Sequence, residues 1–247
     1  MAGEIAATAG IPARPAATAS QRDRRFFTGM GIVIAVIIVA GFAPTYFFRP
    51  LTAKPSLAPL LHLHGIVFTA WVALFVTQTS LVAARRTAVH RRLGLTALVL
   101  VPAMAIIGLV AARASAARGF APPGAPPPLV FLVIPVADIA VFIALAATDF
   151  ALRRRLAAHK RLMLLATIAL LPPATGRLAM MTGQGLLTMF IATDAFIIAM
   201  LIYDRWSRGK IHPATAWGGG FLIASQPLRL AIASTAAWMT FATWFTT

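Results

Sequence analysis

The chain of 247 residues is 60% hydrophobic and 11% charged, and its mean hydropathy is +0.84. It is therefore far more apolar than a soluble domain of this length, which indicates a protein surrounded by a lipid bilayer. The formal net charge of +16 does not indicate nucleic-acid binding, because the basic residues form short clusters between apolar runs, a pattern of membrane topology. The absence of cysteine excludes disulfides, thiolate-bound metals, iron–sulfur clusters and c-type haem.

The first 25 residues are rich in Ala, Thr and Pro and contain few large apolar side chains. They cannot bury enough surface to fold, so residues 1–25 are expected to form a disordered cytoplasmic tail. The apolar run 26–48 that follows is too long for a signal peptide and lacks a small-residue cleavage site. We therefore expect an uncleaved first membrane helix at 26–48, and a single membrane domain over residues 26–247.

Six further apolar runs follow, each about as long as the roughly 20 residues that cross a hydrocarbon core. The expected helices are 57–84, 90–112, 129–152, 159–181, 186–203 and 212–238. The one long connection, Ala114 to Pro128, is rich in proline and is expected to be semi-rigid rather than helical. The sequence thus predicts an all-α, polytopic membrane protein with seven transmembrane helices.

A short motif recurs where three of these helices start. His90-Arg91-Arg92-Leu93-Gly94 has a near copy in His159-Lys160-Arg161-Leu162-Met163, and His212-Pro213 is a weaker echo. Each histidine follows a basic turn and opens an apolar run, which indicates an internal repeat. The chain is therefore expected to consist of one leading helix and three repeated helical hairpins.

The distribution of Lys and Arg predicts the orientation. With the N-terminus in the cytoplasm, sixteen of the 22 Lys and Arg residues lie on the cytoplasmic side, and four lie in outer loops. The positive-inside rule therefore places the N-terminus in the cytoplasm and the C-terminus outside.

This topology sorts the few polar residues into two layers. The cytoplasmic layer contains His90, His159, His212, Asp149 and Asp204. In the simplest interpretation these residues cap helices, while the neighbouring Arg and Lys side chains bind lipid phosphates. Alternatively the three imidazoles and two carboxylates converge on one metal ion. In a further alternative, two histidines ligate a haem b iron while Arg residues such as Arg91 and Arg161 pair with its propionates.

The outer layer contains His64, Asp138, Asp194, Arg177, Arg229 and Gln226. An Asp within a membrane helix costs roughly 2.5 to 3.5 kcal/mol on insertion scales and is a functional-site hypothesis by default. Two Asp and two Arg residues balance in charge, so one interpretation is a pair of buried ion pairs, or a network with His64 and Gln226, that fixes the packing of the hairpins. The alternative is a cavity, open to the outside, that binds a polar headgroup such as a quinone, a lipid or a haem edge. On its helix His64 shares a face with Phe68 and Trp71, which suits a planar ligand and ordinary packing equally.

Several of these positions carry a resemblance to known proteins. They are His64-Gly65, Phe68, Trp71, Gln78, the two motifs at His90 and His159, Asp204, Gly209 and His212-Pro213. Over about residues 57 to 232 the chain resembles uncharacterised bacterial multi-pass inner-membrane proteins of a domain-of-unknown-function family. The His-x-x-Leu helix start is also distantly similar to that of small membrane proteins implicated in cytochrome oxidase assembly. The resemblance implies the bacterial inner membrane and an association with haem or with respiratory-chain proteins.

These observations support four functional hypotheses. The first is a haem- or redox-linked accessory protein, with two of His90, His159 and His212, or His64, as axial ligands. The second is a structural or partner-binding membrane subunit. The third is a transporter or ligand-binding protein that uses the outer layer, and the fourth is a metal-dependent membrane hydrolase that uses the cytoplasmic histidines with Asp149 or Asp204. Whether the protein is an enzyme is left open.

Overall fold

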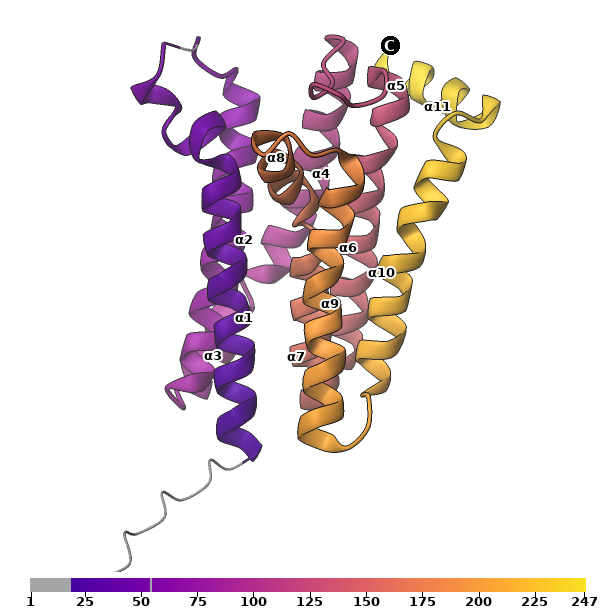
Figure 1. Cartoon of the computed structure of the whole chain (residues 1–247). Helices are drawn as coiled ribbons and strands as arrows, with labels where there is room; N and C mark the ends of the chain where they lie inside the picture. The colour runs from indigo at the N-terminus through magenta and orange to yellow at the C-terminus, as the bar shows by residue number, and fades with distance from the viewer. Residues whose placement is uncertain (1–18, 54) are drawn as a thin grey trace, which may run out of the picture.

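The structure is a computed structural model that describes residues 19–53 and 55–247, and all regular structure within them is helical. The helices are α1 Ala19–Phe42, α2 Pro59–Ala83, α3 Thr87–Gly94, α4 Ala97–Ala117, α5 Pro128–Phe131, α6 Val133–Leu152, α7 Leu156–Ile168, α8 Pro172–Met181, α9 Leu186–Arg208, α10 Pro213–Ile232 and α11 Ala236–Thr246. A π-helical turn, Ala43–Phe47, and a 3-10 turn, Arg49–Leu51, continue α1. The long helices form a bundle with its ends at the top and bottom of Figure 1. The expected all-α class is confirmed.

Five helical segments are long and apolar enough to cross a membrane. They are Ser20–Phe47, Pro59–Ala83, Ala97–Ala117, Pro128–Leu152 and Leu187–Arg208. Helices α7 and α8, bent by 43° at a short break, add a sixth if the pair is one span. Large apolar side chains such as Val36, Ile66 and Val99 are exposed on these segments, as expected when the surrounding solvent is hydrocarbon. The chain therefore has the architecture of a multi-pass membrane protein.

Four of the expected helices are divided in the structure, including 129–152, which forms the short α5 and the longer α6. The expected helix 90–112 is divided into α3 and α4, 159–181 into α7 and α8, and 212–238 into α10 and α11. The break before α8 has a clear cause, because Pro172 and Pro173 supply no N–H for the hydrogen bonds that would continue α7. At the break before α11, Thr235 caps α11 by accepting a hydrogen bond of 3.2 Å from the Trp238 amide.

The first helix also begins earlier than expected. Residues 19–25, which the composition assigns to a disordered tail, belong to α1. The remainder of that expected tail, residues 1–18, lies outside the described residues.

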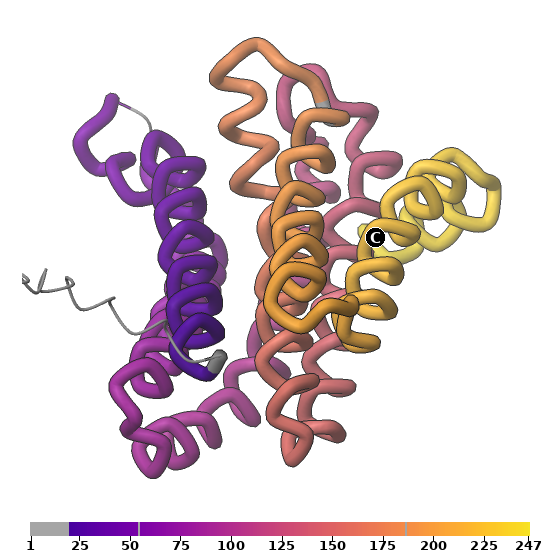
Figure 2. Tube along the Cα trace, turned by 60° about the horizontal axis from the view of Figure 1, so that its bottom comes forward, coloured from indigo at the N-terminus to yellow at the C-terminus, as the bar shows by residue number. Residues whose placement is uncertain are grey.

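The bundle has two flanks joined by central helices. Helices α1 and α2 lie side by side on one flank, and α10 and α11 form the other (Figures 1 and 2). Helix α7 lies between them and contacts α1, α6, α9 and α10. Helix α8 covers one end of the bundle and packs on α1 and α9. Because α7 carries the second histidine motif, the arrangement brings that motif next to several other helices.

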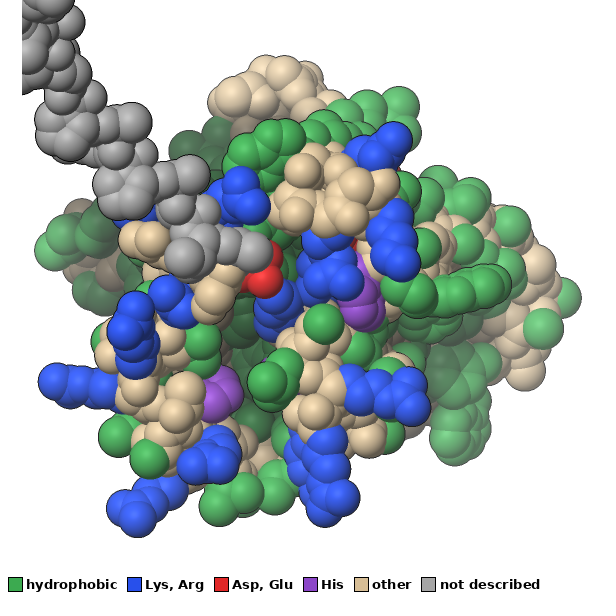
Figure 3. All heavy atoms as spheres, turned by 90° about the horizontal axis from the view of Figure 1, so that it is seen from below, with side chains coloured by type: hydrophobic (Ala, Val, Ile, Leu, Met, Phe, Trp, Pro, Cys, Tyr) green, Lys and Arg blue, Asp and Glu red, His purple; other side chains and the backbone are tan. Residues whose placement is uncertain are grey.

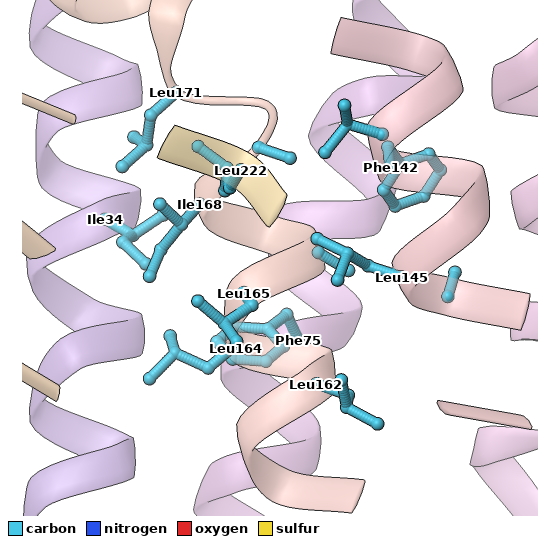
Figure 4. Packing of buried hydrophobic residues seen from close by; sticks show 14 of the residues in the cluster. Ile34, Phe75, Phe142, Leu145, Leu162, Leu164, Leu165, Ile168, Leu171 and Leu222 are labelled. Carbon is cyan, nitrogen blue, oxygen red and sulfur yellow. The ribbon is translucent and has the colours of Figure 1, made fainter. Parts of the chain in front are cut away.

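The core is centred on α7, where Leu164, Leu165 and Ile168 are fully buried. Figure 4 shows these side chains between Ile34 of α1 and Phe142 of α6. Lipid tails are as apolar as these residues, so close van der Waals packing, rather than removal from water, holds the helices together.

Glycine permits the closest approach in this core. A Cβ atom added at Gly218 of α10 would lie 2.7 Å from Cδ1 of Leu165. One at Gly219 would lie 2.7 Å from Cγ2 of Ile197 on α9. Small residues therefore allow α10 to pack directly against α7 and α9, as is common between membrane helices.

Candidate functional site

Two of the three repeated histidines face each other at one end of the bundle. The ring centroids of His90 on α3 and His159 on α7 are 6.3 Å apart, and the ring planes make an angle of 75°. The Nδ1 atom of His159 lies 2.9 and 3.0 Å from the two carboxylate oxygens of Asp149, which is fully buried near the end of α6. A carboxylate can only accept here, so Nδ1–H of His159 donates to Asp149 and the ring is held in a fixed orientation; in the neutral ring the Nε2 lone pair is then left for another partner.

The environment of His90 contains two buried polar atoms that form no hydrogen bond to another described residue. They are Nδ1 of His90 itself and Oε1 of Gln78 on α2. Burial lowers the pKa of His90 below its usual value, and the neighbouring His159 lowers it further. The ring is therefore neutral at neutral pH, which is the form that binds metals.

Gly94, the last residue of the first motif, lies close to Gln78 of α2. A Cβ atom at Gly94 would lie 3.2 Å from Nε2 of Gln78. A larger residue at this position would press on the Gln78 amide, so Gly94 allows α2 and α3 to pack closely next to His90.

The third histidine belongs to a separate network around Asp204 of α9. Asp204 accepts hydrogen bonds from Nε of Arg161 at 3.0 Å and from the hydroxyl of Thr215 at 2.6 Å. The backbone N–H of His212 donates to the same carboxylate at 3.1 Å. The His212 ring itself accepts a hydrogen bond of 3.1 Å from the Ala214 amide and so caps the start of α10. This network joins α7, α9 and α10.

The three histidines and two carboxylates therefore do not converge on one metal ion. Within residues 19–53 and 55–247, no group of three or more His, Asp or Glu side chains is placed to hold a metal. His212 and Asp204 contribute to the α9–α10 connection instead. His212 is the N-cap of α10, whereas His90 and His159 are the fourth residues of α3 and α7, so the third histidine does not occupy an equivalent position. Nor is Arg161 available to a haem propionate, since its buried guanidinium pairs with Asp204. Arg91 is exposed at the same end of the bundle.

A further polar network at this end was not anticipated from the sequence. Asp23 of α1 pairs with the ammonium group of Lys160, and the Tyr203 hydroxyl donates to it at 2.6 Å. The Tyr203 ring stacks on Phe26, with centroids 3.8 Å apart and an interplanar angle of 4°. The one signal in the sequence is an isolated acid, Asp23, within the basic run Arg22 to Arg25. These contacts attach α1 to α7 and α9.

Toward the other end of the bundle, residues of the outer layer form two pairs. The Arg229 guanidinium on α10 pairs with Asp138 on α6, and both side chains are buried. Arg229 also donates to the Ser225 hydroxyl at 2.8 Å. Nε2 of Gln226 donates to the Asp194 carboxylate on α9 at 2.6 Å. These contacts connect α10 to α6 and to α9.

Arg177 does not join these pairs, so the expectation of two Asp–Arg pairs is only half correct. Its guanidinium donates to the Pro173 carbonyl at 2.7 Å and lies 4.2 Å from the centroid of the Phe42 ring. This cation–π contact stabilises the packing of α8 on α1. Helix α8 packs on both α1 and α9, but the Arg177 side chain lies on the side of α8 that faces Phe42 of α1.

His64 stacks on Phe68, with ring centroids 4.2 Å apart. Its Nδ1 atom is buried and forms no hydrogen bond to another described residue. Trp71, the third residue on this face of α2, packs edge-on against Phe142 instead. The contact between His64 and Phe68 follows from their spacing of four residues along the helix.

The chain matches no protein-family model, no curated protein and no solved structure.

Proposed function

We propose that the chain is a bacterial inner-membrane protein with seven transmembrane helices, its N-terminus in the cytoplasm and its C-terminus outside. Helix α10 supports the seventh span, because its 20 residues give a length of about 30 Å, close to the thickness of a hydrocarbon core. It runs beside α6 and α9 over most of the height of the bundle (Figure 1). Its polar residues Gln226 and Arg229 are buried against partners, so they do not meet lipid.

The orientation is supported by the charge at the end of the bundle shown in Figure 3, where Lys and Arg side chains surround the face. In the positive-inside rule such an end lies in the cytoplasm. The proposed membership of the domain-of-unknown-function family, and of the bacterial inner membrane, rests on the motifs quoted above.

Fusions to the C-terminus test the number of spans. Seven spans place the C-terminus outside, so a fused alkaline phosphatase should be active and a fused green fluorescent protein dark. Six spans would reverse both results, because the two termini would then lie on the same side.

Within this topology we propose a redox-linked accessory protein of the respiratory membrane that binds a metal between His90 and His159. The observation that carries this proposal is the separation of 6.3 Å between the two ring centroids, with Asp149 behind one ring. Imidazole nitrogens bind a metal at about 2 Å, so the centroids of two ring ligands of one metal would lie roughly 5 to 6 Å apart, close to the separation of His90 and His159. Imidazole ligands suit zinc, copper and iron, of which copper and iron supply one-electron chemistry.

A whole haem b fits these residues less well than a metal ion does. His90 and His159 would hold the haem iron, but Arg161 is bound to Asp204, so of Arg91 and Arg161 only Arg91 is left for the propionates. Two protein ligands leave a metal incompletely coordinated, so further ligands would come from water or from a partner protein. Such an open site agrees with an accessory role in which the metal passes to another protein.

Metal analysis of the purified protein, together with a visible spectrum, tests this proposal. We expect about one zinc, copper or iron per chain, with loss of the metal in His90→Ala and His159→Ala. Asp149→Asn should weaken binding roughly 10- to 100-fold, because it removes the carboxylate that orients His159. His62→Ala is a matched control, since this histidine is exposed on α2. Metal-free protein after loading, or unchanged binding in both alanine variants, would reject the proposal, and a stoichiometric Soret band would favour haem.

A second candidate, a structural or partner-binding subunit, is favoured by the internal pairing of the buried charges. Asp138 pairs with Arg229, Asp204 with Arg161, and Asp194 with Gln226. Such pairs fix helix packing without requiring a ligand. The ligand-binding hypothesis has less support, because Asp138 is paired with Arg229 and Asp194 with Gln226, although Oδ2 of Asp138 forms no hydrogen bond to another described residue. The hydrolase hypothesis also has less support, because catalytic zinc usually requires three protein ligands. A stable protein that never binds metal would favour the structural candidate.

A further inference from the structure

An open cavity lies between the first turns of α1 and the end of α2. Its volume is about 510 Å³, and it is lined by Gln21, Arg24, Arg25, Thr28, Gly29, Ile32, Ala83 and Arg85. Three of these residues are arginines, and none is an aspartate or a glutamate. The nearest acid in the sequence, Asp23, is directed to Lys160 and Tyr203 instead. The cavity is therefore strongly cationic.

The lining changes character along α1. Arg24 and Arg25 lie at the charged end of the bundle, whereas Gly29 and Ile32 lie one and two turns further along the helix. Ile32 is 49% exposed, so an apolar surface continues from the cationic group into the membrane-spanning part of α1. A cationic end followed by an exposed apolar surface matches the order of phosphate headgroup and acyl chain in a phospholipid.

The conformation of Arg85 provides a separate observation. Its φ of 62° makes it the one non-glycine residue with a positive φ in residues 19–53 and 55–247. It follows the last turn of α2, a position that glycine normally occupies because an L side chain is strained there. Helix α9 ends in this usual way, with Gly209 at φ 72°. At the end of α2 the strained residue carries a guanidinium into the cavity, and strained backbone of this kind often accompanies a functional role.

We propose that this cavity binds the phosphate headgroup of an anionic glycerophospholipid, with an acyl chain along Gly29 and Ile32. Guanidinium groups donate two parallel hydrogen bonds to phosphate, and each has five N–H donors. Arg24 uses one of these on the Ser20 hydroxyl, at 2.6 Å, and keeps others for a ligand. The Thr28 hydroxyl donates to the Thr79 carbonyl on α2 at 3.2 Å, and the three arginines are the charged donors that line the cavity. A bound lipid would bridge α1 and α2 and stabilise this flank of the bundle.

Nanodiscs of phosphatidylcholine with or without phosphatidylglycerol test the proposal. We expect the wild-type midpoint of thermal unfolding to rise when phosphatidylglycerol is present, because a ligand that binds only the folded state stabilises it. Native mass spectrometry should show one retained anionic lipid that resists delipidation. Arg24→Gln and Arg85→Gln should each weaken this binding about tenfold or more, since each removes charge-assisted hydrogen bonds.

Two further variants distinguish a binding role from a merely structural one. Arg85→Gly relieves the backbone strain, so its midpoint in phosphatidylcholine should rise, while the additional rise caused by phosphatidylglycerol should disappear. Arg86→Gln is the matched control, because Arg86 is adjacent and exposed but does not line the cavity. It should retain the wild-type lipid effect.

Two results would overturn the proposal. An equal loss of lipid effect in Arg85→Gln and Arg86→Gln would indicate diffuse surface charge instead of a site. Protection of the protein by inorganic phosphate or glycerol phosphate, without a response to phosphatidylglycerol, would indicate a site for a soluble anion.

Discussion

Replacing Asp204 by alanine should destabilise the bundle by about 3 to 5 kcal/mol, the usual cost of leaving one partner of a buried ion pair uncompensated. In the structure the side chains of Arg161 and Asp204 are 0% and 1% exposed. Without the carboxylate, the Arg161 guanidinium would keep a hydrogen bond of 2.8 Å to the Ala157 carbonyl and a distant contact with the Phe27 ring. The Thr215 hydroxyl and the His212 N–H would also lose their acceptor.

Equilibrium unfolding in mixed micelles with increasing sodium dodecyl sulfate, followed by circular dichroism, measures this free energy. Thr215→Val should cause a smaller loss than Asp204→Ala, about 1.5 to 3 kcal/mol, because it removes only one hydrogen bond to the Asp204 carboxylate. The double variant Arg161→Met with Asp204→Leu should recover much of the stability, because it removes both buried charges together. A loss below about 1 kcal/mol in Asp204→Ala would refute the reasoning, since an exposed pair is worth that amount.

Three further predictions concern other parts of the bundle. Gly41→Ala should cost about 1 to 3 kcal/mol in the same unfolding assay, because its Cβ would lie 2.6 Å from the backbone oxygen of Ala174. Gly220→Ala is the control, since nothing lies within 4 Å of a Cβ there. Arg229→Leu should destabilise the protein more than Arg177→Leu, because Arg229→Leu leaves the buried Asp138 carboxylate without its ion-pair partner. Equal losses in the free energy of unfolding would contradict the assigned pairing. Because burial lowers the pKa of His90 below 6.5, the unfolded state binds the extra proton first, and stability should fall as the pH drops below about 6.5. His90→Gln should show a smaller fall in metal-free protein, and an identical pH profile would refute this assignment.

Much of the secondary structure was predictable from the sequence, for a simple physical reason. A membrane helix must be apolar over a length set by the hydrocarbon core, and its backbone must satisfy its own hydrogen bonds. The runs 57–84 and 129–152 therefore gave bounds close to those of α2 and of α5 with α6. The breaks were less visible, although Pro172 and Pro173 mark the one before α8.

The sequence indicated which residues are candidates for the site, but it did not indicate which of them contact each other. The recurring motif singled out His90, His159 and His212 as candidates, but it did not predict which of their helices are in contact, and in the structure only His90 and His159 face each other. The place of His212 in the Asp204 network could not be predicted, because His212 is the N-cap of α10 whereas His90 and His159 lie inside α3 and α7. The contact of Asp23 with Lys160 joins residues far apart in the chain, and local sequence carries little information about such a contact.

By itself the sequence indicated the helical class and the apolar segments that suit a bilayer, and it predicted the depth at which each polar residue lies. Depth follows from counting residues along a helix, at a rise of about 1.5 Å per residue. Only the tertiary structure decided which partners meet at a given depth. Arg177 and Arg229 lie similarly far from their expected helix starts, yet Arg229 reaches Asp138 while Arg177 lies over Phe42. That choice depends on how each helix is rotated, bent and packed against its neighbours.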